Sequence, residues 1–415
     1  MQPVVSVVIP TYNRADLLRL TLESLVAQTA PRDDFEVIVS DDGSDDGTAE
    51  LVRSFRTRLR LKYTFQEDLG FRAAAARNAG AAHADAPVLA FLDTGVLAGP
   101  ELVRTYRRST APGRCVLGYT HGSASEASTP GLAQALRTMS AQDVRDRYSA
   151  EASFQDARET LPAEADADLG RYALPWTRFW SLNFAVFAAD FWSVGGFDEE
   201  FCGWGMEDLE FGYRLHHRGT SLRMSRLAWA IETPHERSSE ANRASNERNI
   251  RRFLTKHRDP VLELYWAWAL DDYTWSLDDE WLAVHEWADA SRDLSVDEEI
   301  DSALRDLPAG HVAAILGCGR WRPDPAHPHH AFDFDDFYVD HHATNSGCPS
   351  GHPARRALGI RTPLPGVSVD RVVITSRLRG LWKAHGQRIL GEANRIGCSV
   401  WHPPDWETPP GVGVG

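Results

Sequence analysis

The chain has 415 residues, of which 44 are basic and 59 acidic, and its formal charge is −15. This length allows about two or three domains, and 43% hydrophobic with 25% charged residues excludes general disorder. An acidic chain repels phosphate backbones, so we expect no nucleic-acid partner.

The cysteines and the apolar segments bear on the location of the protein. The five cysteines are odd in number and scattered, which argues against a disulfide framework and favours a reducing compartment. The first residues show no secretion signal, and no stretch reaches the roughly 20 apolar residues that span a bilayer. We therefore expect a soluble, cytoplasmic protein without a transmembrane segment.

The first part of the chain alternates between strand and helix patterns. Residues 4–9 form a β-branched run closed by a proline, which is typical of a buried strand. Further strands are predicted at residues 35–40, 61–66 and 88–92, with helices at residues 16–28, 49–55 and 73–84. This alternation, with polar residues where the strands end, predicts an α/β fold with a doubly wound, mainly parallel sheet.

The rest of the chain gives a coarser picture. Residues 101–172 are expected to be helical and loop-like. Residues 176–196 indicate a strand pair or a strand and a helix, and residues 203–219 indicate a loop entering a helix. Strands at residues 311–316, 369–375 and 398–401 and a helix at 378–395 are predicted near the end. The predicted organisation is an α/β domain at residues 1–258, a tryptophan-rich helical connector at 259–308 and a smaller α/β module at 309–415.

Polar side chains follow three of the predicted strands. These are the turn at residues 11–13, the pair Asp41 and Asp42, and Asp93. Ligands of parallel sheets bind where the strands end. Tyr12 offers a ring that stacks on a base, and a carboxylate accepts the imide N–H of uracil. The alternative is an Asp-rich loop that caps the following helix.

Two further clusters carry chemistry. Arg72 or Arg77 would supply the positive charge that a diphosphate needs. The alternative, which is compatible with the first, is an arginine that pairs with Asp41 or Asp93 to hold the strand ends together. The segment GWGMED at residues 203–208 places a flat tryptophan ring beside two carboxylates at a helix start. One carboxylate can hold hydroxyl groups while the other takes a proton; the alternative is that both acids complement the helix dipole.

Five segments occur in an order that points to a family. They read SVVIPTYNR, SDDGSDDGT, QEDLGFRAAAARNAG, FLDTGVL and GFDEEFCGWGMEDLEFGYRL. Over about residues 4–235 the chain resembles the family 2 glycosyltransferases of the Rossmann-like GT-A fold, with an acceptor segment similar to that of galactosyl- and N-acetylgalactosaminyl-transferases. The resemblance implies inverting transfer of a hexose or N-acetylhexosamine from a UDP-sugar. The acceptor stays open among a glycan, a peptide and a small natural product.

The resemblance also implies roles for individual residues. Asp208 would be the catalytic base, and Glu207 beside it would hold sugar hydroxyls. The implied donor-binding residues are Thr11, Tyr12, Asn13, Arg14, Asp41, Asp42, Arg72, Arg77, Asp93 and Trp204.

The metal site departs from the family pattern. The DxD motif of the family reads Asp93-Thr94-Gly95, so its second carboxylate is absent. Asp93, His235 and the donor diphosphate would still hold Mn²⁺ or Mg²⁺, with waters completing the shell. Two alternatives stay open: Arg72 or Arg77 replaces the ion, or the protein is a non-catalytic nucleotide-sugar-binding or scaffold protein.

The end of the chain has a weaker signal. The segment AILGCG at residues 314–319 faintly resembles the cofactor loop of class I methyltransferases. A degenerate or structural α/β module is the favoured interpretation, and a bifunctional glycosyl- and methyltransferase is the alternative. The tryptophan-rich helical span is expected to be core or the interface of a homodimer.

Overall fold

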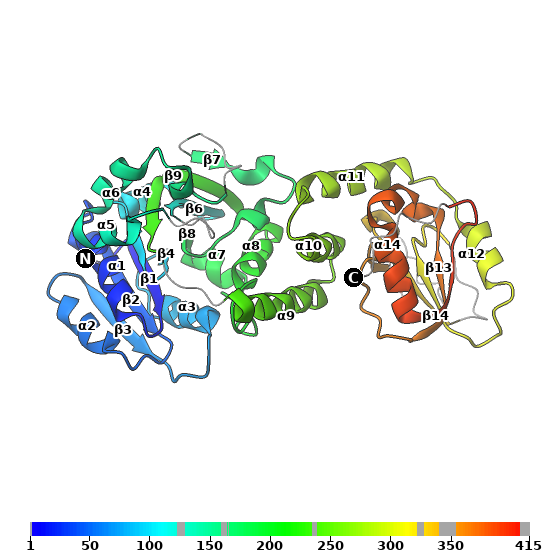
Figure 1. Cartoon of the computed structure of the whole chain (residues 1–415), viewed down its shortest axis with the longest axis horizontal. Helices are drawn as coiled ribbons and strands as arrows, with labels where there is room; N and C mark the ends of the chain where they lie inside the picture. Colours follow the sequence, from blue (N-terminus) through cyan, green and yellow to red (C-terminus); the bar gives the residue numbers. More distant parts are fainter. Residues whose placement is uncertain are drawn as a thin grey trace. The chain divides into compact units, whose positions relative to one another are not determined.

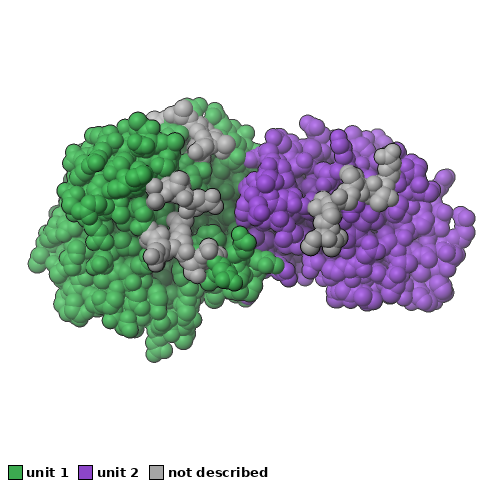
Figure 2. Space-filling model, viewed as in Figure 1, with its two compact units in different colours: residues 1–249 green, residues 250–415 purple. Residues whose placement is uncertain are grey.

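We analysed a computed structural model of the chain, which describes residues 2–122, 129–158, 164, 166–234, 239–321, 328–339 and 354–406 (Figure 1). The chain forms two compact units, residues 1–249 and 250–415, coloured separately in Figure 2. The predicted domain bounds and the homodimer stay predictions. Among the described residues, no helix is long and apolar enough to cross a membrane.

The first unit is built on the predicted parallel strands. β1 (Val5–Thr11), β2 (Phe35–Asp41), β3 (Leu61–Phe65) and β4 (Val88–Leu92) pair in the order β3-β2-β1-β4, all parallel. β2 and β4 are buried along their whole length, as strands covered on both faces are. Three of these strands lie together in the blue part of Figure 1.

Three helices connect these strands. They are α1 (Ala15–Val26), α2 (Thr48–Phe55) and α3 (Ala73–Ala82). Because α3 consists largely of alanine, it lies close to the sheet: a Cβ on Gly80 would stand 2.5 Å from Val8 Cγ1. This close approach brings the polar residues of α3 to the ends of the strands.

The second half of the sheet adds antiparallel pairs. β8 (Asn183–Phe187) lies antiparallel between β4 and β6 (Arg114–His121), and β9 (Ser221–Glu232) runs parallel to β6. The short strands β5 (Val96–Ala98) and β7 (Asp166–Asp168) pair with β9. The sheet is still mainly parallel, as predicted. β9 was not foreseen, and the expectation of helices and loops over residues 101–172 was wrong for β6 and β7.

The remaining helices of this unit surround the second half of the sheet. They are α4 (Leu102–Ser109), α5 (Leu132–Thr138), α6 (Ala141–Tyr148), α7 (Ala188–Ser193) and α8 (Glu207–His217), with short 3₁₀ turns η1 (Arg32–Asp34), η2 (Ala152–Phe154), η3 (Leu169–Arg171) and η4 (Pro175–Arg178). Phe211 of α8 stacks on Phe197 with ring centroids 4.4 Å apart, and Phe184 of β8 stacks on Phe91 of β4 at 4.7 Å. This aromatic core fixes the start of α8 relative to the end of β4.

The second unit contains the predicted helices and a smaller sheet. α9 (Ser239–His257) crosses the division between the units, and α10 (Pro260–Leu270), α11 (Leu277–Ala290) and α12 (Asp297–Leu304) follow. The sheet contains β10 (Ala313–Leu316), β11 (His329–Asp333), β12 (Arg355–Arg356), β13 (Val369–Ile374) and β14 (Gly397–Trp401), with η5 (Ser376–Leu378) and α14 (Arg379–Ile396). All its pairs are parallel, in the order β12-β11-β10-β13-β14.

A buried ion pair lies where β11 of this sheet ends. Asp333, at the end of β11, accepts hydrogen bonds from Arg377 Nη2 at 3.0 Å and from Gly319 N at 2.9 Å. Both Asp333 and Arg377 are fully buried. A carboxylate at the end of the second strand is where a ribose binds in dinucleotide-binding folds. Because Arg377 engages this carboxylate, the contacts favour the structural interpretation of the module over the methyltransferase.

Candidate active site

The ends of β1 and β2 lie side by side in the first unit. Thr11 and Asp41 are register partners, and Asp42 N donates to Thr11 O at 2.9 Å. The hydroxyl of Thr11 is buried and has no hydrogen-bond partner among the described residues. A buried polar atom without a partner is costly unless a ligand or water satisfies it. Thr11 therefore stands where a bound ligand would complete its hydrogen bonding.

Asp41 organises the loop after β2. Its Oδ1 accepts from the backbone N–H of Ser44 at 2.8 Å and of Gly43 at 3.2 Å, and its Oδ2 accepts from Tyr63 Oη at 2.6 Å. Burial raises the pKa of Tyr63 most, and the hydrogen bond to Asp41 raises it further. The hydroxyl of Tyr63 therefore stays protonated and donates to Asp41. The contacts fit the loop-capping interpretation, with both carboxylate oxygens of Asp41 already accepting.

Arg72 pairs with Asp42. The backbone N–H of Arg72 donates to Asp42 Oδ2 at 2.8 Å, and its guanidinium Nη2 lies 3.0 Å from Asp42 Oδ1. The sequence left open a pair with Asp41 or Asp93 for this arginine, and its partner in the structure is the neighbouring Asp42. The pair fixes the start of α3 beside the end of β2.

The residues after β1 frame the same edge. Tyr12 is 41% exposed, and its hydroxyl donates to Asp68 Oδ2 at 2.7 Å, which leaves the ring face open for stacking. Asn13 adopts a positive φ of 47° and accepts from Asp45 N at 2.9 Å. The side chain of Arg14 is exposed.

Arg77 is the centre of the candidate site. It is 3% exposed, and it donates from Nη2 to Asp93 Oδ1 at 2.9 Å and from Nη1 to Glu207 Oε1 at 3.1 Å. Burial by itself would lower the pKa of Arg77. The attraction of the negative charges on Asp93 and Glu207 is larger than this effect and keeps the pKa of Arg77 above its ordinary value. One cation thus joins α3, the end of β4 and the start of α8.

Asp208 lies beside this ion-paired group. Its carboxylate accepts from Leu209 N at 2.8 Å and from Ser181 N at 3.4 Å. Burial, followed by the repulsion of Glu207, raises the pKa of Asp208 to about 7, with Arg77 opposing the shift. A carboxylate with a pKa near neutral pH is matched to general-base catalysis.

The loop before α8 is held in a strained conformation. Met206 has a φ of 76°, in a region that non-glycine residues rarely adopt. At Gly205, with a φ of 97°, a Cβ would lie 2.4 Å from Asn246 Oδ1. Asn249 Nδ2 donates to Gly205 O at 2.8 Å and fixes the loop against α9. Trp204 is 45% exposed here, so its ring is available to a sugar.

The backbone explains the missing second carboxylate. Gly95 adopts a φ of 90°, and a Cβ there would lie 3.4 Å from Leu17 Cδ1. Among the described residues, no three His, Cys, Asp or Glu side chains gather as a metal-ligand set. His235 lies outside the described residues. The side chain of Asp93 is 32% exposed and offers hard oxygen atoms of the kind that Mn²⁺ or Mg²⁺ takes, and both of these oxygens accept from Arg77 Nη2, at 2.9 and 3.2 Å.

The structure brings most of the predicted residues to one edge of the sheet and adds partners that were missed. Tyr63 and Asp68 hold Asp41 and Tyr12, and Gly203 N donates to Phe71 O at 3.0 Å, joining the loop before α8 to the loop before α3. The pairing of Arg77 with Glu207 was also missed. Strand register gave no signal for Tyr63, because it pairs with Val39 and the register partner of Asp41 in β3 is Phe65.

Two protein-family models match the segments of the chain that contain this site. Residues 6–104 match the family "Glycosyl transferase family 2", and residues 163–237 match "N-terminal domain of galactosyltransferase". These two segments contain every described residue of the candidate site.

Individual relatives extend the match. The chain is 43% identical over 414 residues to validoxylamine A glucosyltransferase of Streptomyces hygroscopicus subsp. jinggangensis (strain 5008), covering 97% of each chain. It is 32% identical over 271 residues to chondroitin synthase of Escherichia coli, covering 61% of this chain and 38% of that protein. Among solved structures, S. aureus TarS 1-349 in complex with UDP-GlcNAc has a TM-score of 0.46 at 19% identity, over 61% of this chain and 66% of that one.

The relative from Streptomyces is aligned with this chain almost end to end. The chain belongs to the family 2 glycosyltransferases and has their α/β, GT-A type of fold.

Proposed function

We propose that this glycosyltransferase moves a glucosyl residue from UDP-glucose to a small hydroxylated acceptor of the validoxylamine A type, with inversion at the anomeric carbon. The choice of glucose and of a small acceptor is supported by the two Streptomyces hygroscopicus validoxylamine A glucosyltransferases, each 43% identical over 97% of this chain. Among the acceptors left open by the sequence, a small natural product is therefore favoured.

The observation that carries the mechanism is Asp208 beside the ion pair of Arg77 and Glu207. In the proposed step, the acceptor hydroxyl gives its proton to the Asp208 carboxylate while its oxygen bonds to the anomeric carbon. The bond from that carbon to the diphosphate oxygen breaks, and its electron pair leaves with UDP. Because attack and departure are on opposite faces, one such displacement inverts the configuration.

The neighbouring residues would bind and orient the reactants. Arg77 already engages Glu207 Oε1, which leaves Oε2 of Glu207 for a hydroxyl of the bound sugar. Thr11 and Tyr12 would contact the nucleoside, and Trp204 would cover a sugar ring. Asp93, with His235 as the further predicted ligand, would hold Mn²⁺ or Mg²⁺, which when bound neutralises charge on the diphosphate.

The donor and the stereochemistry are tested together. Purified protein is incubated with UDP-glucose and validoxylamine A, UDP release is followed, and the product is analysed by proton NMR. We expect one glucosyl product whose anomeric configuration is opposite to that of the donor. A product with the donor's configuration would exclude single displacement at Asp208, and turnover with another UDP-sugar but not UDP-glucose would exclude glucose as the transferred sugar.

A further inference from the structure

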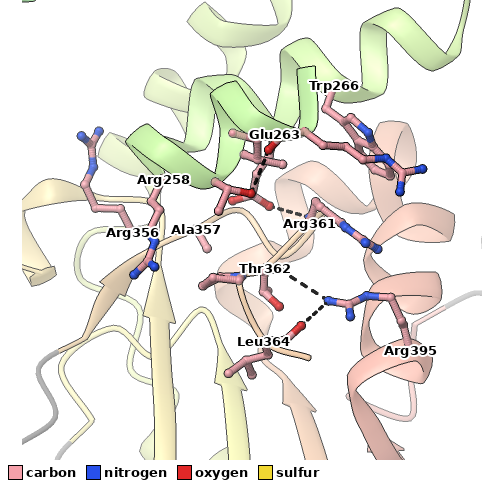
Figure 3. Close-up of a pocket in the computed structure, with 13 residues that line it drawn as sticks. Arg258, Glu263, Trp266, Arg356, Ala357, Arg361, Thr362, Leu364 and Arg395 are labelled. Atoms are coloured by element: carbon pink, nitrogen blue, oxygen red, sulfur yellow. Dashed lines mark hydrogen bonds between the residues drawn. The ribbon is translucent and has the colours of Figure 1, made fainter. Parts of the chain in front are cut away.

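The second unit contains a pocket that the glycosyltransferase site does not use. Its volume is about 280 Å³, and it lies between the end of α9, α10, the loop after β12 and α14 (Figure 3). Five arginines and one acidic residue are among its lining side chains: Arg251, Arg258, Arg356, Arg361, Arg395 and Glu263. In a chain whose formal charge is −15, this concentration of cations is unusual.

The acidic residue of the pocket is already engaged by the backbone. Glu263 is buried, and its carboxylate accepts three N–H groups at 2.8 Å, from Leu358, Ile360 and Arg361. Figure 3 shows this carboxylate pointing from α10 to the loop that carries Arg361. Glu263 therefore serves to fix the loop after β12. Burial raises the pKa of Glu263 to about 8 against the effect of these three donors, so near neutral pH it adds little negative charge to the pocket.

One arginine fixes the same loop from the other side. Arg395 donates from Nη2 to Leu364 O at 2.7 Å and from Nε to Glu392 Oε2 at 2.7 Å. The buried Glu392 also accepts from Thr362 N at 2.8 Å. The pocket wall is thus held at two points, which is the rigidity that a binding site needs.

Arg361 has weaker contacts than Arg395. Its Nη1 lies 3.5 Å from Glu392 Oε2, and its guanidinium carbon stands 5.6 Å from the centre of the Trp266 ring. Burial lowers the pKa of Arg361 below its ordinary value, and repulsion by Arg395 and Arg251 adds to this, with Glu392 opposing. Cations placed so close together repel one another unless an anion joins them.

We propose that this pocket binds a small phosphorylated molecule, with the phosphate held by Arg251 and Arg361 and the attached ring lying against Trp266. The guanidinium fork matches phosphate oxygens in pairs, and a phosphate monoester, with a charge of about −1.5 to −2, suits a site lined by several arginines better than a carboxylate with a single charge does. The volume is at the lower end of ligand pockets and fits a sugar phosphate rather than a dinucleotide. The site is built entirely from residues of the second unit, so it is distinct from the donor site.

The test uses the whole chain and three titrants in isothermal calorimetry: glucose 6-phosphate, inorganic phosphate and glucose. We expect glucose 6-phosphate to bind, glucose not to bind, and added salt to weaken the binding. Arg251→Gln combined with Arg361→Gln should weaken binding at least tenfold. The matched control, Arg379→Gln, changes an arginine of the same unit that is 63% exposed and should bind as the wild type does.

Recognition of the ring and binding of the phosphate are tested separately. Inorganic phosphate that binds as tightly as the sugar phosphate would overturn recognition of the ring, and Trp266→Ala should remove the difference between the two. Unchanged binding in the double arginine variant would overturn the site itself. If that variant does not fold, amide hydrogen exchange of residues 357–364 is measured in the wild type instead. Glucose 6-phosphate should slow this exchange, and unaltered exchange would contradict the proposal.

Discussion

The Arg77→Met variant tests the ion-paired centre of the site. The substitution removes a cation that is 3% exposed and leaves the carboxylates of Asp93 and Glu207 without it. Breaking a buried ion pair costs about 3–5 kcal/mol of unfolding free energy. Because the Asp93 side chain is 32% exposed and water can solvate it, we expect a loss of unfolding free energy at the lower end of this range, about 3 kcal/mol.

The size of this effect can be measured by chemical denaturation and by thermal unfolding. A loss of about 3 kcal/mol corresponds to a melting temperature roughly 6–12 °C lower for a unit of this size. Glu207→Gln on the Arg77→Met background should recover part of the loss, because it removes one of the repelling carboxylates, and the coupling free energy should be about 1–3 kcal/mol.

The control for this series is Arg53→Met. Arg53 forms a pair with Glu50 at 3.6 Å in which the side chains are 66% and 70% exposed, so the change should be within about 0.5 kcal/mol. The reasoning would be refuted if Arg77→Met stayed within about 1 kcal/mol of the wild type, or if the double variant lost the sum of the single losses.

Four further predictions concern the site. Transfer should decline as the pH falls below about 7, because Asp208 takes up a proton, and a rate independent of pH between 5 and 8 would contradict its role as base. The raised pKa means that the folded state binds this proton more tightly than the unfolded chain does, so the wild type loses this stabilisation as the pH rises from about 4 to about 7. Asp208→Asn has no such proton to lose. Denaturation should therefore show its stability increasing relative to the wild type over this pH range. EDTA should lower turnover by about 100-fold, and Mn²⁺ should restore it, as expected for an ion bound at Asp93. A turnover rate that neither EDTA nor Mn²⁺ changes would exclude a metal requirement. Gly95→Ala should cost about 1–2 kcal/mol because of the φ of 90° at this residue, and a variant as stable as the wild type would show that the backbone there is not constrained.

The sequence was sufficient for the parallel half of the first sheet. β1, β2 and β4 are short, nearly continuous apolar runs, which is how strands buried on both faces look in a sequence. The polar residues directly after them had to meet at one edge once the sheet was parallel.

The strands that were missed lack such a pattern. β9 mixes buried residues with Arg223 and Arg226, and its pairing with β6 shifts register between Gly118 and Thr120, so no alternation is visible. β11 has five residues within a segment rich in histidine and proline, and the importance of Asp333 at its end was missed with it.

The contacts of the candidate site could not be deduced from local patterns. Arg77 and Glu207 are 130 residues apart in the chain, and Arg77 and Asp93 are 16 apart. Which of two arginines pairs with which of several carboxylates depends on side-chain directions that the folded chain fixes. The left-handed backbone at Met206 likewise has no signal in its own residue type.

The most direct measurement compares glucosyl transfer and UDP binding in Asp208→Asn. The account predicts that this variant binds UDP with the affinity of the wild type while its turnover falls by about 10²–10⁴-fold. Asp16→Asn, which changes an exposed aspartate of α1, should transfer at the wild-type rate. Full turnover in Asp208→Asn would contradict the assignment of Asp208 as the base that activates the acceptor.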